Sequence, residues 1–529
     1  MTEAQLPRTD VCIVGAGPAG ALLADSLAEA GHEVVVLEAG PRFDPENRTR
    51  QMEQSIRPGD DDRSVWGMGG PRDAYSATGE NFYPLNHSRV KGVGGSTLHW
   101  QGMVMRMPKS DFEATGPDGG RWPLDYDDLR SHYTKAEREL GVAGASDNPF
   151  EPPRDEPYPM PAFAPSHSDS IFAEACEKLG IATHAVGNAR NSETYDGRSA
   201  CVGYGTCKPV CPSGAKYSAD VTIRKAEEKG VNVVTEAPVQ RLETDSSGTT
   251  VEAAVYVKDG EERRQKASQF VLAAGGVEIP RLLLLSASDQ HPEGLANSSG
   301  VIGRYFMDHL FAGMGGRLPA KKTRQNHVGF NTTESHQFYD TDDDVGPIKL
   351  EFLNYAGPSP VELAMHSAEF GDDLLDSLRS AYGHDLGIGA LVGQPPRKEN
   401  YVGLDTSKTD DHGNPVPDVH WRIGEAERRT LARANEIQRA IFDELGVDVG
   451  WVVGPDNTGP AYHHMGTTRM GANPETSVVD SRLRTHDVSN LTIASSSVFV
   501  TSGAMNPTLT IAALALRAAD FVDESLKQE

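Results

Sequence analysis

Residues 11–40 limit the possible folds of this chain more than any other stretch. An apolar run, VCIVG at 11–15, predicts a buried strand that leads into the glycine-rich turn GAGPAG at 15–20. The next segment has the apolar spacing of a helix ending at Gly31, and EVVVLEAG at 33–40 predicts a second strand. The three segments form a βαβ unit with its glycines at the strand-to-helix turn, which is the setting of a dinucleotide site.

The chemistry of this turn indicates which residues contact the dinucleotide. Glycines let the backbone approach a pyrophosphate, the helix N-terminus offers free N–H groups, and Glu38 can accept hydrogen bonds from a ribose diol. The position of the motif near the N-terminus favours FAD. The predicted contacts in this unit are Gly15, Gly17, Ala19, Gly20, Glu38 and Ala39.

Further glycine-rich and strand-like segments supply additional backbone approaches to the cofactor. They are VKGVGGSTLHWQG at 90–102, VNVVTEAPVQRLE at 231–243 and QFVLAAGGVEIPRLLLLS at 269–286, in which Gly275 and Gly276 precede an expected helix. The cofactor contacts predicted in them are Gly94, Gly95, Ser96, Val239, Ala274 and Gly275.

The composition limits the class of protein. At 529 residues the chain is too long for one ordinary core, so we expect at least two domains. Its 76 acidic and 50 basic side chains give a net charge of −26, which argues against a nucleic acid or an anionic membrane surface as partner. Strong salt would screen this self-repulsion, so the composition indicates a halophilic origin.

Targeting signals are also informative. The first ten residues, MTEAQLPRTD, have neither the basic nor the apolar region of a signal peptide, so we expect none in this chain. No stretch reaches the ~18 apolar residues that span a bilayer, and Arg517 interrupts the apolar C-terminal segment. We therefore expect no direct membrane span. The protein would be cytoplasmic, or exported and membrane-associated through a partner subunit.

The order of these segments predicts an α/β (α+β) protein with a discontinuous nucleotide domain. The Rossmann-like FAD-binding domain would comprise residues 1–105, 200–304 and 456–529. Residues 106–199 and 305–455 would form an inserted substrate-binding or cap domain. Short strands and turns in the second insert predict that this domain is built on a mostly antiparallel sheet.

Six motifs in order resemble those of the glucose–methanol–choline (GMC) oxidoreductases. They are VGAGPAG from residue 14, GVGGSTLHW from 92, VLAAGGVEIPRLLLLS from 271, GRYFMDHL from 303, HHMGTTRMG from 463 and NPTLTIAALAL from 506. The resemblance implies an FAD enzyme that oxidises an alcohol group. Within the family it resembles the branch of the FAD-dependent gluconate, glucose and fructose dehydrogenase catalytic subunits.

The resemblance assigns the catalytic pair. In this family a His in H-x-x-G-T and a His or Asn in the C-terminal motif face flavin N5, which here implies His463 and Asn506. His463 would accept the hydroxyl proton while hydride passes to the flavin, and Asn506 would orient the hydroxyl. Pro507 and Thr508 would approach the isoalloxazine, and Ser495 the ribityl chain and phosphates. His99 directly precedes a Trp, as in members with covalent FAD, so covalent attachment and simple packing near the ring are both open.

Three of the five cysteines lie close together in CVGYGTCKPVC at 201–211. A disulfide would leave one thiol over, and it is not expected in a chain without a secretory signal. Zinc would need a fourth ligand such as His184 or His99, and nothing in the sequence places either there. A glycine-rich loop that wraps an iron–sulfur cluster fits better, although three thiolates fall short of the usual four.

In glucose-oxidising members of the branch named above, the same C-x5-C-x3-C spacing binds 3Fe–4S, so the resemblance assigns the cluster to Cys201, Cys207 and Cys211. It implies a dehydrogenase that passes electrons through the cluster to an external acceptor. The family's partners are a small helper subunit and a cytochrome c subunit. The substrate would be a sugar, a sugar acid or a polyol. The alternatives are an oxidase that uses O2 and has structural cysteines, and a non-catalytic flavoprotein.

Overall fold

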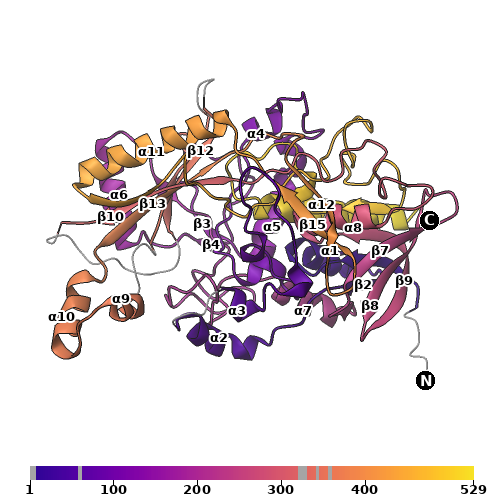
Figure 1. The fold of residues 1–529 in the computed structure, drawn as a ribbon, viewed down its shortest axis with the longest axis horizontal. Coiled ribbons are helices and arrows are strands. Elements are labelled where there is room, and N and C mark those ends of the chain that lie inside the picture. Colours follow the sequence, from indigo (N-terminus) through magenta and orange to yellow (C-terminus); the bar gives the residue numbers. More distant parts are fainter. Residues whose placement is uncertain (1–6, 58–61, 320–330, 341–344, 355–359, 529) are drawn as a thin grey trace.

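The computed structural model describes residues 7–57, 62–319, 331–340, 345–354 and 360–528. Two β-sheets organise this part of the chain, one toward each end of an elongated molecule (Figure 1). The mixed α/β architecture expected from the sequence is confirmed.

The first sheet contains the predicted βαβ unit. Its order is β6-β2-β1-β9-β8-β7, with β17 beside β9. β1 pairs in parallel with β2 and β9, so that Val11 lies opposite Val34 and Gln269, whereas β7 and β8 run antiparallel. The strands are β1 (Thr9–Val14), β2 (Val34–Leu37), β6 (Asn232–Val234), β7 (Val239–Thr244), β8 (Val251–Lys258), β9 (Glu261–Leu272) and β17 (Leu491–Ile493). Every residue of β2 is buried, as expected for a strand in the middle of a covered parallel sheet.

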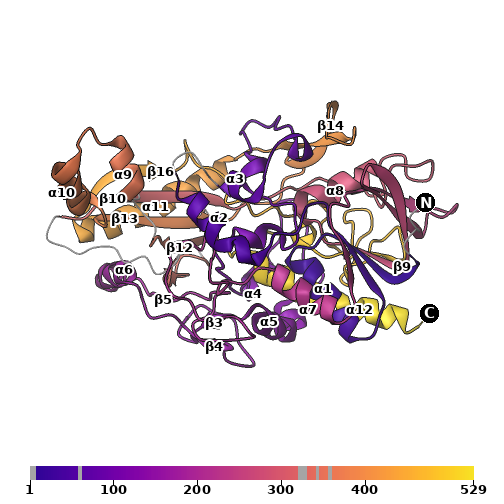
Figure 2. The same ribbon diagram turned by 90° about the horizontal axis from the view of Figure 1, so that it is seen from below.

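Helices from distant parts of the sequence gather beside this sheet. α1 contacts both α7 and α12, and α12 contacts α5 (Figure 2). Their bounds are α1 (Pro18–Glu29), α5 (Tyr126–Leu140), α7 (Asp220–Glu228) and α12 (Thr508–Leu526). The α5 helix belongs to a segment assigned to the substrate domain, yet Tyr133 on it hydrogen-bonds Thr510 on α12 across 2.8 Å.

The second sheet is antiparallel throughout and has the order β16-β10-β13-β12-β11-β5. Its strands are β5 (His184–Ala185), β10 (Leu310–Arg317), β11 (Thr333–Ser335), β12 (Ile348–Phe352), β13 (Asp385–Val392) and β16 (Asp448–Val453). The helices α6 (His167–Lys178) and α11 (Glu425–Leu445) pack against it. These strands come from the two segments predicted to form the substrate domain, whose boundaries stay a prediction.

The remaining elements are a hairpin and several short helices and strands. The hairpin of β14 (Tyr401–Thr409) and β15 (Pro415–His420) contacts α8 (Gly275–Leu285). Smaller elements are α2 (Arg48–Ser55), α3 (Asp62–Trp66), α4 (Lys109–Glu113), α9 (Pro360–His366), α10 (Gly371–Ala381), β3 (Ala143–Gly144) and β4 (Met160–Pro161). Short 3₁₀ turns cover Pro45–Asn47, Pro71–Asp73, Leu85–His87, Gly95–Leu98 and Ser496–Val498. No helix in the described ranges has the length and apolar character needed to cross a bilayer.

Candidate active site

A cavity of about 590 Å³ joins the glycine-rich turn to the C-terminal histidine and asparagine. The predicted site residues that line it are Gly15, Gly17, Ala19, Glu38, Ala39, Gly95, Ser96, His99, Val239, Ala274, Gly275, His463, Ser495, Asn506, Pro507 and Thr508. Gly20 and Gly94 lie outside the lining. The cavity therefore brings together side chains from both ends of the sequence.

The glycine-rich turn is shaped for a bulky ligand. Gly15 has φ +105°, and a Cβ there would lie 2.8 Å from the Ala273 carbonyl oxygen. A Cβ on Gly20 would lie 2.0 Å from the Gly15 carbonyl oxygen, so Gly20 lets α1 pack against the turn. A Cβ on Gly17 would meet no protein atom within 4 Å. Open space at the N-terminus of a helix suits the pyrophosphate of FAD, and these residues fit that cofactor.

Glu38 organises the same turn. Its Oε2 accepts a hydrogen bond from the Ala16 N–H at 2.8 Å, and its Oε1 accepts one from the Gly40 N–H at 2.9 Å. Burial raises the pKa of Glu38, and the two amide bonds oppose that rise. Each carboxylate oxygen has a second lone pair, so Glu38 can bind these amides and a ribose hydroxyl together.

His463 is held by two residues of the segment preceding β10. Its backbone N–H donates to Asp308 Oδ1 at 2.8 Å, and its ring Nδ1 lies 2.8 Å from His309 Nδ1. His309 Nε2 lies 3.0 Å from the Ser502 carbonyl oxygen, which can only accept, so Nε2 carries the His309 proton.

This chain of bonds determines the tautomer of His463. Burial lowers the pKa of His309 to about 4, so its ring is neutral and its Nδ1 must accept. His463 Nδ1 is then the donor, and His463 Nε2 keeps its lone pair. Burial, followed by the neighbouring His309, Lys349 and His464, holds the pKa of His463 well below its ordinary value. The imidazole of His463 is therefore neutral, with its proton on Nδ1 and a lone pair on Nε2 that can accept a proton.

The adjacent His464 has different surroundings. Its ring lies 5.7 Å from that of Tyr83 and 6.0 Å from that of Phe306. Burial lowers its pKa to about 3. His463 is the member of the pair that has a ring-to-ring hydrogen bond to His309.

Asn506 is oriented by a buried lysine that the sequence did not single out. Lys349 Nζ donates to Asn506 Oδ1 at 2.6 Å and to Glu351 Oε1 at 2.6 Å. An ammonium group can only donate, so it fixes the oxygen side of the Asn506 amide. The Nδ2 of Asn506 is left to donate into the cavity that this residue lines.

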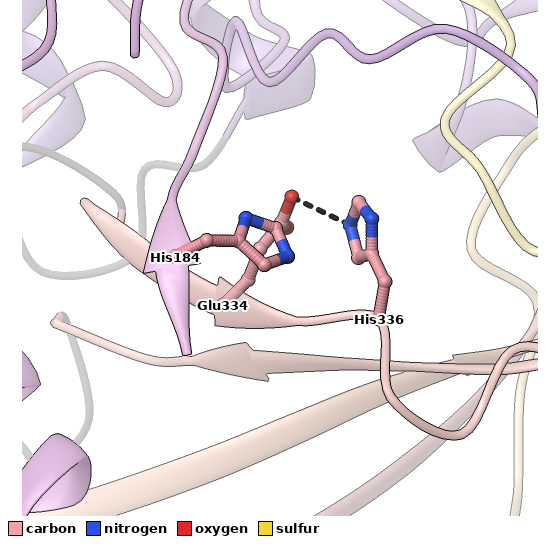
Figure 3. Close-up of side chains that lie close together, drawn as sticks. All are labelled: His184, Glu334 and His336. Carbon is pink, nitrogen blue, oxygen red and sulfur yellow. Dashed lines mark hydrogen bonds and ion pairs between the residues drawn. The ribbon is translucent and has the colours of Figure 1, made fainter. Parts of the chain in front are cut away.

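Lys349 also reaches a cluster of potential metal ligands, formed by His184, Glu334 and His336 (Figure 3). Glu334 lies 3.5 Å from Lys349 Nζ and 2.9 Å from His336 Nε2. The His336 ring packs edge-on against His184 with ring centroids 4.3 Å apart. The ammonium beside Glu334 already supplies a positive charge, which disfavours a second cation at this carboxylate.

The three predicted cluster ligands each have a polar partner on the 201–216 loop or beside it. The Gly203 amide hydrogen-bonds Cys201, the Arg190 guanidinium lies 3.6 Å from Cys207 Sγ, and the Lys216 N–H lies 3.4 Å from Cys211 Sγ. Burial raises the pKa of Cys201, and the charges of Cys207 and Cys211 raise it further. Among the described residues, however, the three thiols do not form a group with all ligand atoms within 4.8 Å of one another, as His184, Glu334 and His336 do. Burial also raises the pKa of Cys211, but the Lys216 amide and ammonium, together with Ser213 and Arg48, outweigh it, and the net shift is downward.

One side chain ties this loop to the cavity wall. Lys216 Nζ donates to the carbonyl oxygens of Leu98 at 3.2 Å, Trp100 at 2.6 Å and Cys207 at 2.7 Å. Leu98 and Trp100 flank His99, which lines the cavity. The other two cysteines lie elsewhere, Cys12 in β1 and Cys176 in α6.

Sequence reasoning missed His309, Lys349 and Glu351. His309 lies within the quoted motif GRYFMDHL, but nothing in the motif indicated a bond to residue 463. Lys349 and Glu351 alternate with apolar residues in β12, a pattern typical of a strand with one face in water. In the structure both faces of β12 are buried.

Comparison with known proteins identifies the same regions. The family model for GMC oxidoreductases matches residues 81–311, and its C-terminal counterpart matches residues 396–515. A family model for an FAD binding domain matches residues 8–56.

Similar proteins cover nearly the whole chain. The fructose dehydrogenase large subunit of Gluconobacter japonicus is 34% identical, with 98% of each chain covered. The 2-methyl-1,2-propanediol dehydrogenase of Mycolicibacterium austroafricanum is 31% identical over 97% of this chain and 95% of that protein. Among solved structures, pyridoxine 4-oxidase from Mesorbium loti has the same fold, with a TM-score of 0.65 at 20% identity over 97% of this chain and 98% of the other.

Proposed function

Since this chain belongs to the GMC oxidoreductase family, we propose that it oxidises an alcohol group of a sugar, a sugar acid or a polyol, with His463 as the base. It is an FAD-dependent oxidoreductase that acts on CH–OH groups. The observation that carries the proposal is the single cavity that joins the Gly15–Glu38 turn to His463 and Asn506.

The chain's own residues divide the work on the substrate hydroxyl. When bound, FAD supplies the hydride acceptor, N5 of its isoalloxazine. Asn506 Nδ2 donates to the hydroxyl oxygen and holds its carbon toward the cofactor. His463 Nε2 accepts the hydroxyl proton and holds it on the ring, while the Nδ1–H bond to His309 keeps the imidazole in one orientation.

The reductive half-reaction tests this proposal. Under anaerobic conditions, a panel of sugars, sugar acids and polyols should bleach the flavin absorbance of the wild type. His463→Gln should bleach about 10²- to 10⁴-fold more slowly, because the general base is lost. The matched control is His366→Ala, which changes an exposed histidine on α9. Equal bleaching by His463→Gln and wild type would refute the role of His463.

We also propose that Cys201, Cys207 and Cys211 hold a 3Fe–4S cluster. When bound, it would supply a one-electron carrier between the flavin and an external acceptor. The amide and guanidinium donors around the thiols support this, because such donors stabilise thiolates and cluster sulfides. An oxidase with structural cysteines would instead form peroxide rapidly and contain no iron.

The proposed partners are a small helper subunit and a cytochrome c-type or other electron acceptor. The relative from Gluconobacter is named as a large subunit, which supports a multi-subunit assembly. Val202 and Tyr204, next to Cys201, are 68% and 56% exposed, and such side chains suit a docking surface beside the cluster. The location would then be cytoplasmic, or exported and membrane-associated through such a partner.

The attachment of FAD has a direct test. His99 is buried and lines the cavity. A flavin bonded to it would remain with the protein pellet after acid precipitation, whereas FAD that is only packed beside it would pass into the supernatant.

A further inference from the structure

The carboxylate of Glu351 lines the cavity together with His463 and Asn506, and it has no role in the mechanism described above. Ile348, Leu350 and Phe352 of β12 pack into the core of the six-stranded sheet. Between them, Lys349 and Glu351 carry charge into the interior. Glu351 lines the cavity, with Asn506 and His463, although it is only 3% exposed.

Lys349 joins this carboxylate to the catalytic asparagine. Its Nζ lies 2.6 Å from both Glu351 Oε1 and Asn506 Oδ1. Because both oxygens bind one nitrogen, the carboxylate and the amide are neighbours. Hydroxyls on nearby carbons of one substrate molecule can therefore reach both groups.

One oxygen of Glu351 is available for a ligand. Among the described residues, the hydrogen bond to this carboxylate comes from Lys349 and goes to Oε1. Oε2 is left without a protein donor there. Burial raises the pKa of Glu351, and the Lys349 ammonium opposes that rise. In its ionised form the carboxylate only accepts hydrogen bonds, so the group that completes it is a donor such as a hydroxyl.

Glu334 provides the contrast. It lies directly opposite Glu351 across the β11–β12 pair and contacts the same lysine. Its carboxylate is turned to His336, as Figure 3 shows, and it is absent from the cavity lining. The two glutamates share Lys349, but only Glu351 presents its charge to the cavity.

We propose that Glu351 is a second substrate anchor, which accepts a hydrogen bond from a hydroxyl near the carbon that is oxidised. This inference rests on the proposed function and narrows its substrate class. Neutral sugars and polyols with neighbouring hydroxyls satisfy Oε2. A sugar acid with its carboxylate nearby would meet a like charge in a poorly solvated site, so such substrates are disfavoured.

The test compares Glu351→Gln with Glu334→Gln as the matched control, since both remove a carboxylate from Lys349. The reductive half-reaction is measured with fructose, glucose and sorbitol, and with gluconate. In Glu351→Gln, kcat/KM for the best neutral substrate should fall roughly 10- to 100-fold, mainly through KM, because a charge-assisted hydrogen bond is lost. The ratio of neutral substrate to gluconate should fall with it. Glu334→Gln should keep the wild-type ratio.

Each outcome has a distinct meaning. An unchanged ratio in Glu351→Gln, or an equal change in both variants, would overturn the anchor while leaving the proposed function intact. A wild type whose flavin no alcohol reduces would overturn the proposed function itself. If Glu351→Gln fails to load FAD, Glu351→Asp carries the test. It keeps the charge but shortens the reach, so it should lose the neutral substrate and still reject gluconate.

Discussion

At the scale of single residues, His463 and Asn506 are oriented by groups that can only accept or only donate a hydrogen bond. The Ser502 carbonyl can only accept, and through His309 it leaves the lone pair of His463 on Nε2. The Lys349 ammonium can only donate, so it leaves Asn506 with a free donor. A base and a hydrogen-bond donor thus line the same cavity, which is the pairing that one hydroxyl group needs.

The pH dependence of flavin reduction should report the pKa of His463. That pKa lies well below 6.5, chiefly because of burial and then because of His309 and Lys349. Since the base must be neutral, activity is present above this pKa and is lost as the pH falls through it. The acid limb of kcat/KM should therefore lie below pH 6.5. Lys349→Met removes a positive neighbour, so it should raise the pKa and move the limb to higher pH.

The control for this profile is Glu351→Gln, which removes a cavity carboxylate that is not among the groups shifting the pKa of His463, so it should leave the acid limb in place. An acid limb at or above pH 6.5 in the wild type would contradict the environment described for His463. A limb that moves to lower pH in Lys349→Met would contradict the sign of the charge effect.

The sequence could predict residues whose role is encoded in short spacing. His463 and Asn506 lie in motifs that the family resemblance assigns, and the cavity brings them together with the predicted flavin contacts. Their partners could not be predicted, because Lys349 and His309 act through contacts between segments far apart in the chain. Charged residues that alternate with apolar ones, as in β12, are typical of a strand with one face in water, and only the packing of the second sheet reveals that both faces are buried.

At the scale of elements, the glycine-rich turn separates two effects of adding one methyl group. Gly20→Ala should destabilise the protein and weaken FAD binding, since its Cβ would lie 2.0 Å from the Gly15 carbonyl oxygen. Gly17→Ala meets no protein atom within 4 Å, so the melting temperature of the apoprotein should stay near the wild-type value. FAD affinity should still fall, because the methyl group enters the space for the pyrophosphate. Calorimetry of the apoproteins and FAD titration measure the two effects. Equal FAD affinity in Gly17→Ala and wild type would contradict the placement.

The cysteine loop makes a prediction about composition. Purified wild type should contain iron and labile sulfide in the 3:4 ratio of a 3Fe–4S cluster, with about three irons per flavin. Cys207→Ser should lose most of the iron but keep FAD, because Cys207 does not line the cavity. Cys176→Ser is the matched control, since that thiol is buried in α6 and should not affect the iron content. Metal analysis measures the iron, a sulfide assay measures the labile sulfide, and flavin absorbance measures the FAD that is retained. A wild type without iron, or iron retained in Cys207→Ser, would contradict the cluster.

Elements whose contacts are local in the sequence could be predicted, whereas elements whose contacts join distant segments could not. The βαβ unit was predictable, because strand, turn and helix are adjacent in sequence and each has a local signal. In the second sheet, β10 pairs with β13 and β16, which lie far along the chain, and β5 joins its edge from another segment. Alternation can indicate such strands, but it cannot indicate their order. Nor does it reveal that α5 packs on α12.

At the scale of the whole molecule, the active site exists only where the two halves meet. The first sheet, in which β1, β2, β6, β9 and β17 pair in parallel, contributes the turn after β1 and the segments that follow β9 and β17. The antiparallel sheet contributes Phe311, Glu351 and Leu391 to the same cavity. Under the proposed function, the first sheet would hold the cofactor, and the second sheet would add Glu351 to the substrate contacts of His463 and Asn506. Changes in the second sheet should alter substrate choice and leave the glycine-rich turn intact.

The charge of the whole molecule predicts its response to salt. If every one of the 50 basic side chains were paired, 26 of the 76 acidic ones would still lack a partner, so net repulsion opposes the folded state. Between about 0.1 and 1 M salt the Debye length falls from about 10 to 3 Å, and this repulsion is screened. The melting temperature should therefore rise by at least ~2 °C over that range in KCl, and equally in NaCl.

Screening also weakens the surface ion pairs, such as that between Arg379 and Asp376 on α10, so the expected rise is a net effect. Sucrose added to dilute buffer provides the control. It favours compact states without screening charge, so it should not reproduce the steep rise in melting temperature that the first additions of salt cause. Calorimetry of the holoenzyme, with FAD content checked at each salt concentration, separates folding stability from loss of cofactor. A flat or falling midpoint would show that the acidic surplus is already compensated in dilute buffer, and the composition would then give no indication of a high-salt origin.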